Sequence, residues 1–469
     1  MANKESVAII GSGPAGLCAA YILRRAGYEV VVFEKAQYVA LAGHSYRLMK
    51  DNPLGKPAEH ASEWKTTKVA TDDPSSIVID IPLRVFSGTY YTNWFRMLDH
   101  LGVSSRIHRF HYTFTDPQRQ YTQYFSNFHR ILPSLANGLW VNLYLLFWYL
   151  WFTAACFWVP PRTSNSDNSN LMETFDEYHQ RIGLPTKFVD WYILPLFSSV
   201  ATCSHDDLRQ IPADYIVRYR KGTIGFDHRT ACMDTLERRL TEGVSVKLGQ
   251  TVSSVESEDD LVRVEHCGSD GNATQSHFNH VILAISAAEA TKIHHASAPV
   301  TSQLRTRKVS VKVHRPAHGT LAPPREGFMD NVHSEGFQLH TQRTDLDDLT
   351  SHSTHYHPSG MVVTVSPMIE DSTDNQHGIT HEKVDHTVHL MRPLVSPKSH
   401  ALLQDVFGAG PHAPRSKGTW RNGDGNVYIA GGYASAGLPL LENCLRSAIE
   451  AAVRIGATPP FPVDRRTTF

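Results

Sequence analysis

The pattern of apolar and polar positions is clearest at the start of the chain. Val7–Ile10 is a short apolar run, as expected of a buried parallel strand. The glycine-rich segment 11–16 follows at once, and Leu17 to Ala26 has the composition of a helix. A second apolar run, 29–33, ends at Glu34. The pattern predicts a strand, a tight turn, a helix and a second strand.

This arrangement suits the binding of a dinucleotide. Gly11 permits the tight turn, Gly13 lets the backbone approach a pyrophosphate, and Gly16 lets the helix pack closely on the strand. The helix N-terminus directs free N–H groups at the phosphates. Glu34 is placed to accept hydrogen bonds from ribose hydroxyls, which favours FAD or NAD over NADP. The cofactor contacts predicted here are Gly11, Gly13, Pro14, Ala15, Gly16, Glu34 and Lys35.

The other end of the chain has a matching pattern. A strand is predicted over 426–430, followed by Gly431 and Gly432 in a glycine-marked connection. Leu441 to Ile455 then places its apolar residues on one helical face.

Between the two ends the pattern predicts a helix, a strand-rich region and one long apolar segment. The helix is expected over Thr230 to Leu240. The expected strands are 244–248, 251–255, 261–266, 278–285 and Met361 to Val365.

The apolar segment 139–159 has 21 residues and no charge, which is long enough to cross a bilayer. If the segments on either side of it share one cofactor domain, a simple crossing is excluded. Two interpretations stay open: contact with one face of a membrane, or a buried helix of a substrate domain. Both favour a hydrophobic substrate.

Composition and charge exclude several classes of protein. Hydrophobic residues make up 41% of the chain and charged residues 19%, which indicates a folded globular protein. Lys and Arg total 45 against 46 Asp and Glu, so no basic field points to nucleic acid. Six scattered cysteines and no secretory leader pattern predict an intracellular protein, cytoplasmic or on the face of an internal membrane.

Histidine is frequent, at 27 residues, and concentrates between His294 and His412. No acidic residue or cysteine accompanies these histidines at a recognisable ligand spacing. We interpret the stretch as a solvated polar surface and predict no metal site. Its close groups are His352, His355 and His357, and His386 with His389.

The segment 41–45, Leu-Ala-Gly-His-Ser, resembles the Gly-Gly-Arg or Gly-Gly-His segment of the amine oxidase and phytoene desaturase superfamily of flavoproteins. Ala42 replaces the first glycine, and the preceding spacer is two residues longer. Segments 78–86 and 90–103 are similar to that family's loop over the flavin. The chain is most like a branch in which the glycine-pair segment carries histidine.

The resemblance implies an α/β fold, with a Rossmann-like FAD-binding domain assembled from discontinuous segments and an inserted α+β substrate domain. The FAD domain is expected over 1–90, 218–292 and 418–460, and the substrate domain over 91–217 and 293–417. FAD is expected to bind without a covalent link. The family's pattern adds as cofactor contacts Gly43, His44, Val252, Gly431, Gly432, Leu441, Glu442 and Asn443.

No second strand–GxGxxG–helix unit is found, which favours an oxidase, dehydrogenase or desaturase over a two-dinucleotide enzyme. We expect it to take hydride from a hydrophobic small molecule such as a lipid or a secondary-metabolite intermediate. A redox-neutral isomerase or cyclase and a non-catalytic flavin-binding protein remain alternatives. No catalytic residue is predicted. Arg84, Tyr90 and Tyr91 are expected either to border the pocket or to have structural roles.

Overall fold

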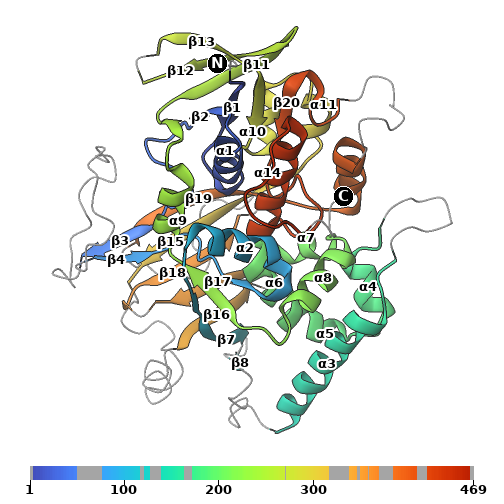
Figure 1. Cartoon of the computed structure of the whole chain (residues 1–469). Coiled ribbons are helices and arrows are strands. Elements are labelled where there is room, and N and C mark those ends of the chain that lie inside the picture. Colours follow the sequence, from blue (N-terminus) through green and yellow to red (C-terminus); the bar gives the residue numbers. More distant parts are fainter. Residues whose placement is uncertain are drawn as a thin grey trace.

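The computed structural model describes residues 4–49, 76–116, 121–126, 139–162, 172–269, 271–315, 337–345, 349–357, 359–368, 384–408 and 420–464. These residues form two layered units (Figure 1). One is built on a parallel sheet near the N-terminus. The other combines a large mixed sheet with a group of helices. Several segments of the predicted substrate domain, 163–171 and 316–336 among them, lie outside the described residues.

The parallel sheet contains the predicted dinucleotide-binding strands. Its order is β10-β2-β1-β14-β20, and all four pairings are parallel. Both faces are covered, and the central residues of its strands are apolar and buried. The bounds are β1 Ser6–Ile10, β2 Glu29–Phe33, β10 Ser245–Lys247, β14 His280–Leu283 and β20 Val427–Ile429.

Two layers cover this sheet. Helices on one face share a hydrophobic core with β1 and β2, namely α1 (Pro14–Arg25), α2 (Thr92–Leu101), α9 (Met233–Thr241) and α14 (Leu441–Ile455). The other face packs on an antiparallel sheet and short helices, namely β11 (Thr251–Glu258), β12 (Leu261–Cys267), β13 (Ala273–Phe278), α10 (Ala287–Ile293), α11 (Ala298–Thr301) and α13 (Pro397–Leu403).

The second unit is built on a mixed sheet in the order β19-β15-β18-β17-β16-β7-β8. The pair β7 and β16 is parallel and joins two distant chain segments, and the other pairings are antiparallel. The strand predicted over Met361 to Val365 is present in this sheet as β18. Its strands are β7 (Arg109–Asp116), β8 (Tyr121–Ser126), β15 (Thr306–His314), β16 (Phe337–Asp345), β17 (Thr350–Tyr356), β18 (Val362–Pro367) and β19 (Val384–Pro393).

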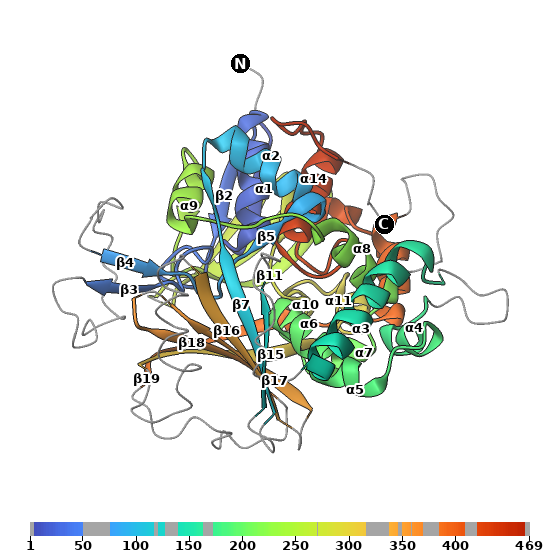
Figure 2. The same ribbon diagram turned by 90° about the horizontal axis from the view of Figure 1, so that it is seen from below.

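A group of helices flanks this sheet, and Figure 2 shows them gathered to one side of it. Helix α6 packs on β16 and β17, while α3 packs on α8. The helices are α3 (Leu139–Trp158), α4 (Phe175–Arg181), α5 (Thr186–Phe188), α6 (Leu194–Ala201), α7 (His205–Arg209) and α8 (Ala213–Thr223).

Smaller elements connect the two units. The hairpin of β3 (Tyr46–Met49) and β4 (Ser76–Ile79) precedes a three-stranded sheet of β5 (Phe86–Ser87), β9 (His228–Ala231) and β6 (Ser105–Ile107). The packing crosses the predicted domain boundaries. Ile79 and Ile81, assigned by sequence to the FAD domain, pack with Val309 and Val311 of the mixed sheet. Leu403, assigned to the substrate domain, packs in the core beneath the parallel sheet.

Helix α3 corresponds to the apolar segment predicted from sequence. Among the described residues it is the one helix long and apolar enough to cross a membrane. Only 22% of its most apolar stretch is buried. Its inner side contributes Leu145, Phe152 and Cys156 to the helical core. The helix is thus neither a free span nor a fully buried core helix.

Candidate cofactor and substrate cavity

The glycines in the turn after β1 have two different roles. Gly11 has φ +102°, and a Cβ there would lie 2.6 Å from the Ala284 carbonyl oxygen. A Cβ on Gly16 would lie 2.0 Å from the Gly11 carbonyl oxygen. At these two positions, glycine is therefore required because any side chain would clash with the protein's own backbone. A Cβ on Gly13 would meet no protein atom within 4 Å, so this glycine leaves its space open to a ligand.

A cavity of about 420 Å³ lies at this turn. It brings together predicted residues that are far apart in the sequence, because the C-terminal ends of β1, β14 and β20 meet at one edge of the parallel sheet. Pro439, Leu440 and Leu441 also line the cavity, so α14 begins at its wall. The predicted cofactor residues on the wall are Gly13, Pro14, Ala15, His44, Gly431, Gly432 and Leu441.

Other residues predicted to contact the cofactor do not line the cavity. Glu34 is buried and accepts hydrogen bonds from Ser12, through the backbone N at 2.9 Å and Oγ at 2.7 Å. Gly43 must be glycine, because a Cβ there would lie 2.1 Å from the Tyr38 ring. Val252 faces the core beneath the sheet, and Lys35 is exposed. Contacts of these residues with the cofactor stay predictions.

The side chains of Glu442 and Asn443 face away from the cavity. The Glu442 carboxylate accepts the backbone N–H groups of Asn93 and Trp94, at 3.2 and 2.8 Å, at the N-terminus of α2. Asn443 donates to the carbonyl oxygens of Ser435 and Ala436 and fixes the loop before α14.

Of the three residues expected at the border, two line the cavity. Arg84 and Tyr91 are on its wall. The Tyr90 hydroxyl instead accepts from the backbone N of Leu438 at 3.1 Å, and it lies 3.3 Å from Oδ1 of Asn443. Tyr90 therefore has the structural role of holding the loop that leads into α14.

Two partly buried arginines give the cavity a positive wall. Arg84 donates through Nη2 to the Leu41 carbonyl oxygen at 2.7 Å, while its Nη1 has no hydrogen-bond partner in the described structure. Arg392, which sequence reasoning missed, also lines the cavity, and its Nε lacks a described partner. Burial lowers the pKa of both guanidiniums, and for Arg392 the nearby Arg84 adds to the effect. Partly buried cations with spare donors suit an anionic ligand.

Comparison with known families identifies the family to which this chain belongs. The family model of flavin-containing amine oxidoreductases matches residues 67–456, and that of an NAD(P)-binding Rossmann-like domain matches residues 9–101. The chain belongs to the flavin-containing amine oxidoreductase family. Its cofactor is FAD. Gly13 and Arg84 fit that assignment, since open space beside a glycine turn and an unpaired buried donor are what a pyrophosphate requires.

Similar proteins agree with the fold of this oxidoreductase. Cyclohexylamine oxidase from Brevibacterium oxydans matches with a TM-score of 0.58 at 13% identity, over 97% of this chain and 99% of that one. A putative protoporphyrinogen oxidase from Exiguobacterium gives the same values. Two flavin-containing monooxygenases of Arabidopsis thaliana are 36% identical over 90 residues, which is 18% of this chain and 20% of theirs. The match thus spans about a fifth of the length of these curated relatives.

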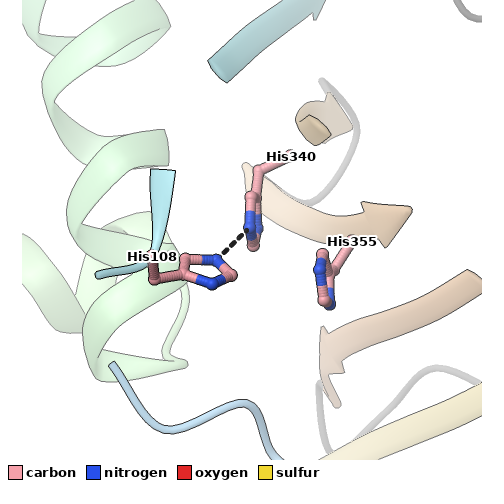
Figure 3. Close-up of side chains that lie close together, drawn as sticks. All are labelled: His108, His340 and His355. Atoms are coloured by element: carbon pink, nitrogen blue, oxygen red, sulfur yellow. Dashed lines mark hydrogen bonds between the residues drawn. The ribbon is translucent and has the colours of Figure 1, made fainter. Parts of the chain in front are cut away.

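The cavity of this oxidoreductase continues from the glycine turn to the mixed sheet. Its apolar lining there comes from Tyr112, Val363, Val365 and Leu390. Three buried histidines, His108, His340 and His355, lie close together in this region, and His340 and His355 line the cavity itself (Figure 3).

These histidines correct the interpretation of the histidine-rich stretch as a solvated surface. His355 is only 5% exposed, although His389 on β19 is exposed as expected. The available signal was on β16, where the polar residues His340, Gln342 and Thr344 alternate and all face inward. That alternation has the period of a strand, but its buried face is polar, so hydrophobicity alone did not mark it.

Proposed function

We propose that this oxidoreductase removes hydride from a C–H bond of a hydrophobic small molecule, as an oxidase, dehydrogenase or desaturase with non-covalent FAD. The observation that carries the proposal is the continuity of one cavity from the glycine turn and α14 to the apolar residues of the mixed sheet. Such a cavity allows a substrate carbon to lie against a cofactor held at the other end. A lipid or a secondary-metabolite intermediate has the required apolar surface.

The chain's own residues have defined tasks in this reaction. FAD, when bound, supplies the hydride acceptor. The N-terminus of α14, with Leu441 at the cavity wall, directs backbone N–H groups toward negative charge that develops on reduction. Arg392 adds a partly buried positive charge to the same cavity. Val363 and Leu390 exclude water from the reacting carbon.

The test is anaerobic mixing of the FAD-loaded protein with a panel of lipids, terpene-like and polyketide-like compounds. Loss of the oxidised flavin absorbance with one class supports hydride transfer. Product without bleaching supports the isomerase or cyclase alternative, and neither result with any compound favours a non-catalytic flavin-binding protein. The variant Leu390→Trp is expected to retain FAD and lose bleaching, because it fills the substrate end of the cavity. Leu261→Trp, at an exposed strand position, is the matched control.

We also propose that α3 rests on a membrane surface, which would place this intracellular protein on the face of an internal membrane. The support is its outer side, where large apolar residues are exposed at helical spacing (Leu139, Leu143, Leu146, Phe147 and Leu150). Trp140 and Trp158, near the two ends, are 82% and 77% exposed. Tryptophan favours the interface between lipid and water. A helix that lies in the interface keeps both neighbouring units on one side.

Flotation with phosphatidylcholine–phosphatidylglycerol vesicles tests the membrane proposal. The wild type is expected to float with the vesicles. A triple variant that combines Leu143→Ser, Leu146→Ser and Leu150→Ser is expected to remain at the bottom. The control carries Leu261→Ser, since that leucine is exposed elsewhere. A wild-type protein that stays at the bottom with intact FAD would exclude the membrane contact and leave the proposed chemistry untouched.

A further inference from the structure

The three buried histidines come from three separate parts of the chain. His340 on β16 and His355 on β17 are directly paired in the antiparallel register, so both rings extend from the same face of the sheet. The rings stack with centroids 4.5 Å apart and an angle of 6° between their planes. His108 lies just before β7 and extends toward His340 from the side, as Figure 3 shows.

The ring nitrogens converge at the spacing of metal ligands. One ligand nitrogen from each residue lies within 4.8 Å of the other two. The Nε2 atoms of His108 and His340 are 3.5 Å apart. In a tetrahedral zinc site, with Zn–N bonds of about 2.0–2.1 Å, two ligand nitrogens lie about 3.4 Å apart. The pair already has this separation. The His355 ring must turn out of its stack with His340 before both rings can direct an in-plane nitrogen lone pair at the same ion.

The surroundings favour a metal ligand over a charged imidazole. Burial lowers the pKa of each of the three rings, to about 4 for His108. A neutral imidazole is the form that binds a metal ion. Within the part of the chain that the structure describes, no carboxylate joins this cluster, and three neutral imidazoles leave a bound divalent ion with its full positive charge. They also leave one position of a tetrahedral site for a further ligand.

We propose that His108, His340 and His355 bind one divalent transition-metal ion of the Zn²⁺ type at the substrate end of the cavity. The open position then takes an anionic oxygen of the substrate, such as a carboxylate or an enolate. This second part rests on the proposed function, because it names how that substrate is held. It assigns the substrate class as a hydrophobic molecule with one anionic oxygen group, and Arg392 in the same cavity suits the same charge.

The experiment uses the untagged, FAD-loaded protein, stripped with a chelator and dialysed against Zn²⁺. Elemental analysis is expected to give one zinc ion per chain. Competition with a coloured chelator measures the affinity for zinc. In the double variant His340→Asn with His355→Asn, zinc binding is expected to be at least about a hundredfold weaker, because only one ligand remains. His108→Gln is a second variant, outside the mixed sheet's paired strands, in case the double variant folds poorly.

The control is His294→Asn. His294 is as buried as His108 and burial likewise lowers its pKa to about 4, but it hydrogen-bonds Ser297 beside α10. With 27 histidines in the chain, this control separates a built site from general zinc affinity. Full zinc binding in His294→Asn, with loss in the cluster variants and unchanged flavin absorbance, supports the site.

Two results would overturn the proposal. One is a wild type that fails to hold zinc stoichiometrically, which would leave the histidines as a hydrogen-bonded cluster. The other is zinc that remains in both cluster variants. Neither measurement needs a substrate, so failure of the proposed oxidation would be seen separately as a flavin that no compound bleaches. Substrate anchoring itself predicts at least about a tenfold rise in KM when zinc is removed, and an unchanged KM would refute it.

Discussion

The parallel sheet and the mixed sheet bury opposite kinds of side chain. In β1, Val7, Ala8 and Ile9 have no exposed surface, and the layers on both faces are apolar. In β16 the buried residues include Gln342 and Thr344, each at or below 4% exposure. The first sheet is an apolar support for the cofactor site, whereas the second forms part of a chamber with a polar wall.

This difference has an energetic reason. Buried polar groups cost free energy unless they are hydrogen-bonded, so a polar sheet face must be built as a network. Gln342 donates to the Ser353 hydroxyl at 2.9 Å, and the hydroxyls of Thr344 and Ser351 lie 3.0 Å apart. His205 on α7 joins Ser351 at 2.7 Å. Such a network tolerates a cavity, whereas the apolar sheet relies on close packing.

The largest effect is expected from Gly13→Val, which should abolish cofactor binding at the parallel sheet and leave the mixed sheet intact. The added side chain occupies the open space at the glycine turn without meeting a protein atom at its Cβ. Bound FAD is expected to be lost completely, while the fold and the mixed sheet are retained. The ratio of flavin to protein absorbance after purification measures the loss, and circular dichroism checks the fold. A yellow, fully loaded variant would show that the cofactor does not approach this turn.

The next largest effect is expected from Ile9→Ala in the parallel sheet. Ile9 is fully buried between two apolar layers that cannot collapse easily around a void. The free energy of unfolding is expected to fall by about 4 kcal/mol. Chemical denaturation of the FAD-free protein measures it. A fall below about 1 kcal/mol would mean that this sheet is no more closely packed than the chamber wall.

A third effect concerns the helical layer that covers the parallel sheet. Glu237 on α9 accepts the backbone N–H of Ala42 at 2.7 Å, and burial, followed by the nearby Asp234, raises its pKa from 4.5 to about 7. The folded state therefore holds this proton more tightly than the unfolded state. Stability is expected to fall as pH rises from 4.5 to 7, by about 3 kcal/mol from this group. Thermal unfolding of Glu237→Gln across that range should show a flatter profile, and parallel profiles would contradict the assignment.

The smallest effect is expected from Gln342→Met in the mixed sheet. The side chain is 1% exposed, its Nε2 bonds Ser353, and its Oε1 has no partner in the described structure. Methionine removes an unsatisfied acceptor but leaves Ser353 without its donor, so the two changes largely offset each other. The free energy of unfolding is expected to change by about 1 kcal/mol or less. A loss like that of Ile9→Ala would show that the polar network is as closely coupled as the apolar core.

The parallel sheet was predictable because its information is local. The apolar run 29–33 and the helix Leu441–Ile455 have the predicted bounds, and the strand predicted over 278–285 is shorter, at His280–Leu283. Family resemblance supplied the joining of these segments into one FAD domain.

The polar half of the cavity was not predictable in the same way. His108 meets His340 and His355 only through the parallel pairing of β7 with β16 and the register between β16 and β17. Arg392 reaches the cavity from β19, at the far edge of the sheet order from β7. Strand order and register between distant segments are not encoded in any single stretch of sequence, so the residues that these pairings bring together could not be named.

The order of the strands in the parallel sheet also has a consequence for biosynthesis. More than four hundred residues separate the end of α1 at Arg25 from the start of α14 at Leu441, yet the two helices pack side by side. A ribosome therefore releases the glycine turn long before the opposite wall of the FAD site exists. Nascent chains should capture the vitamin-derived cofactor only near the end of translation, and until β20 is made one edge of β14 stays unpaired and open to wrong pairing.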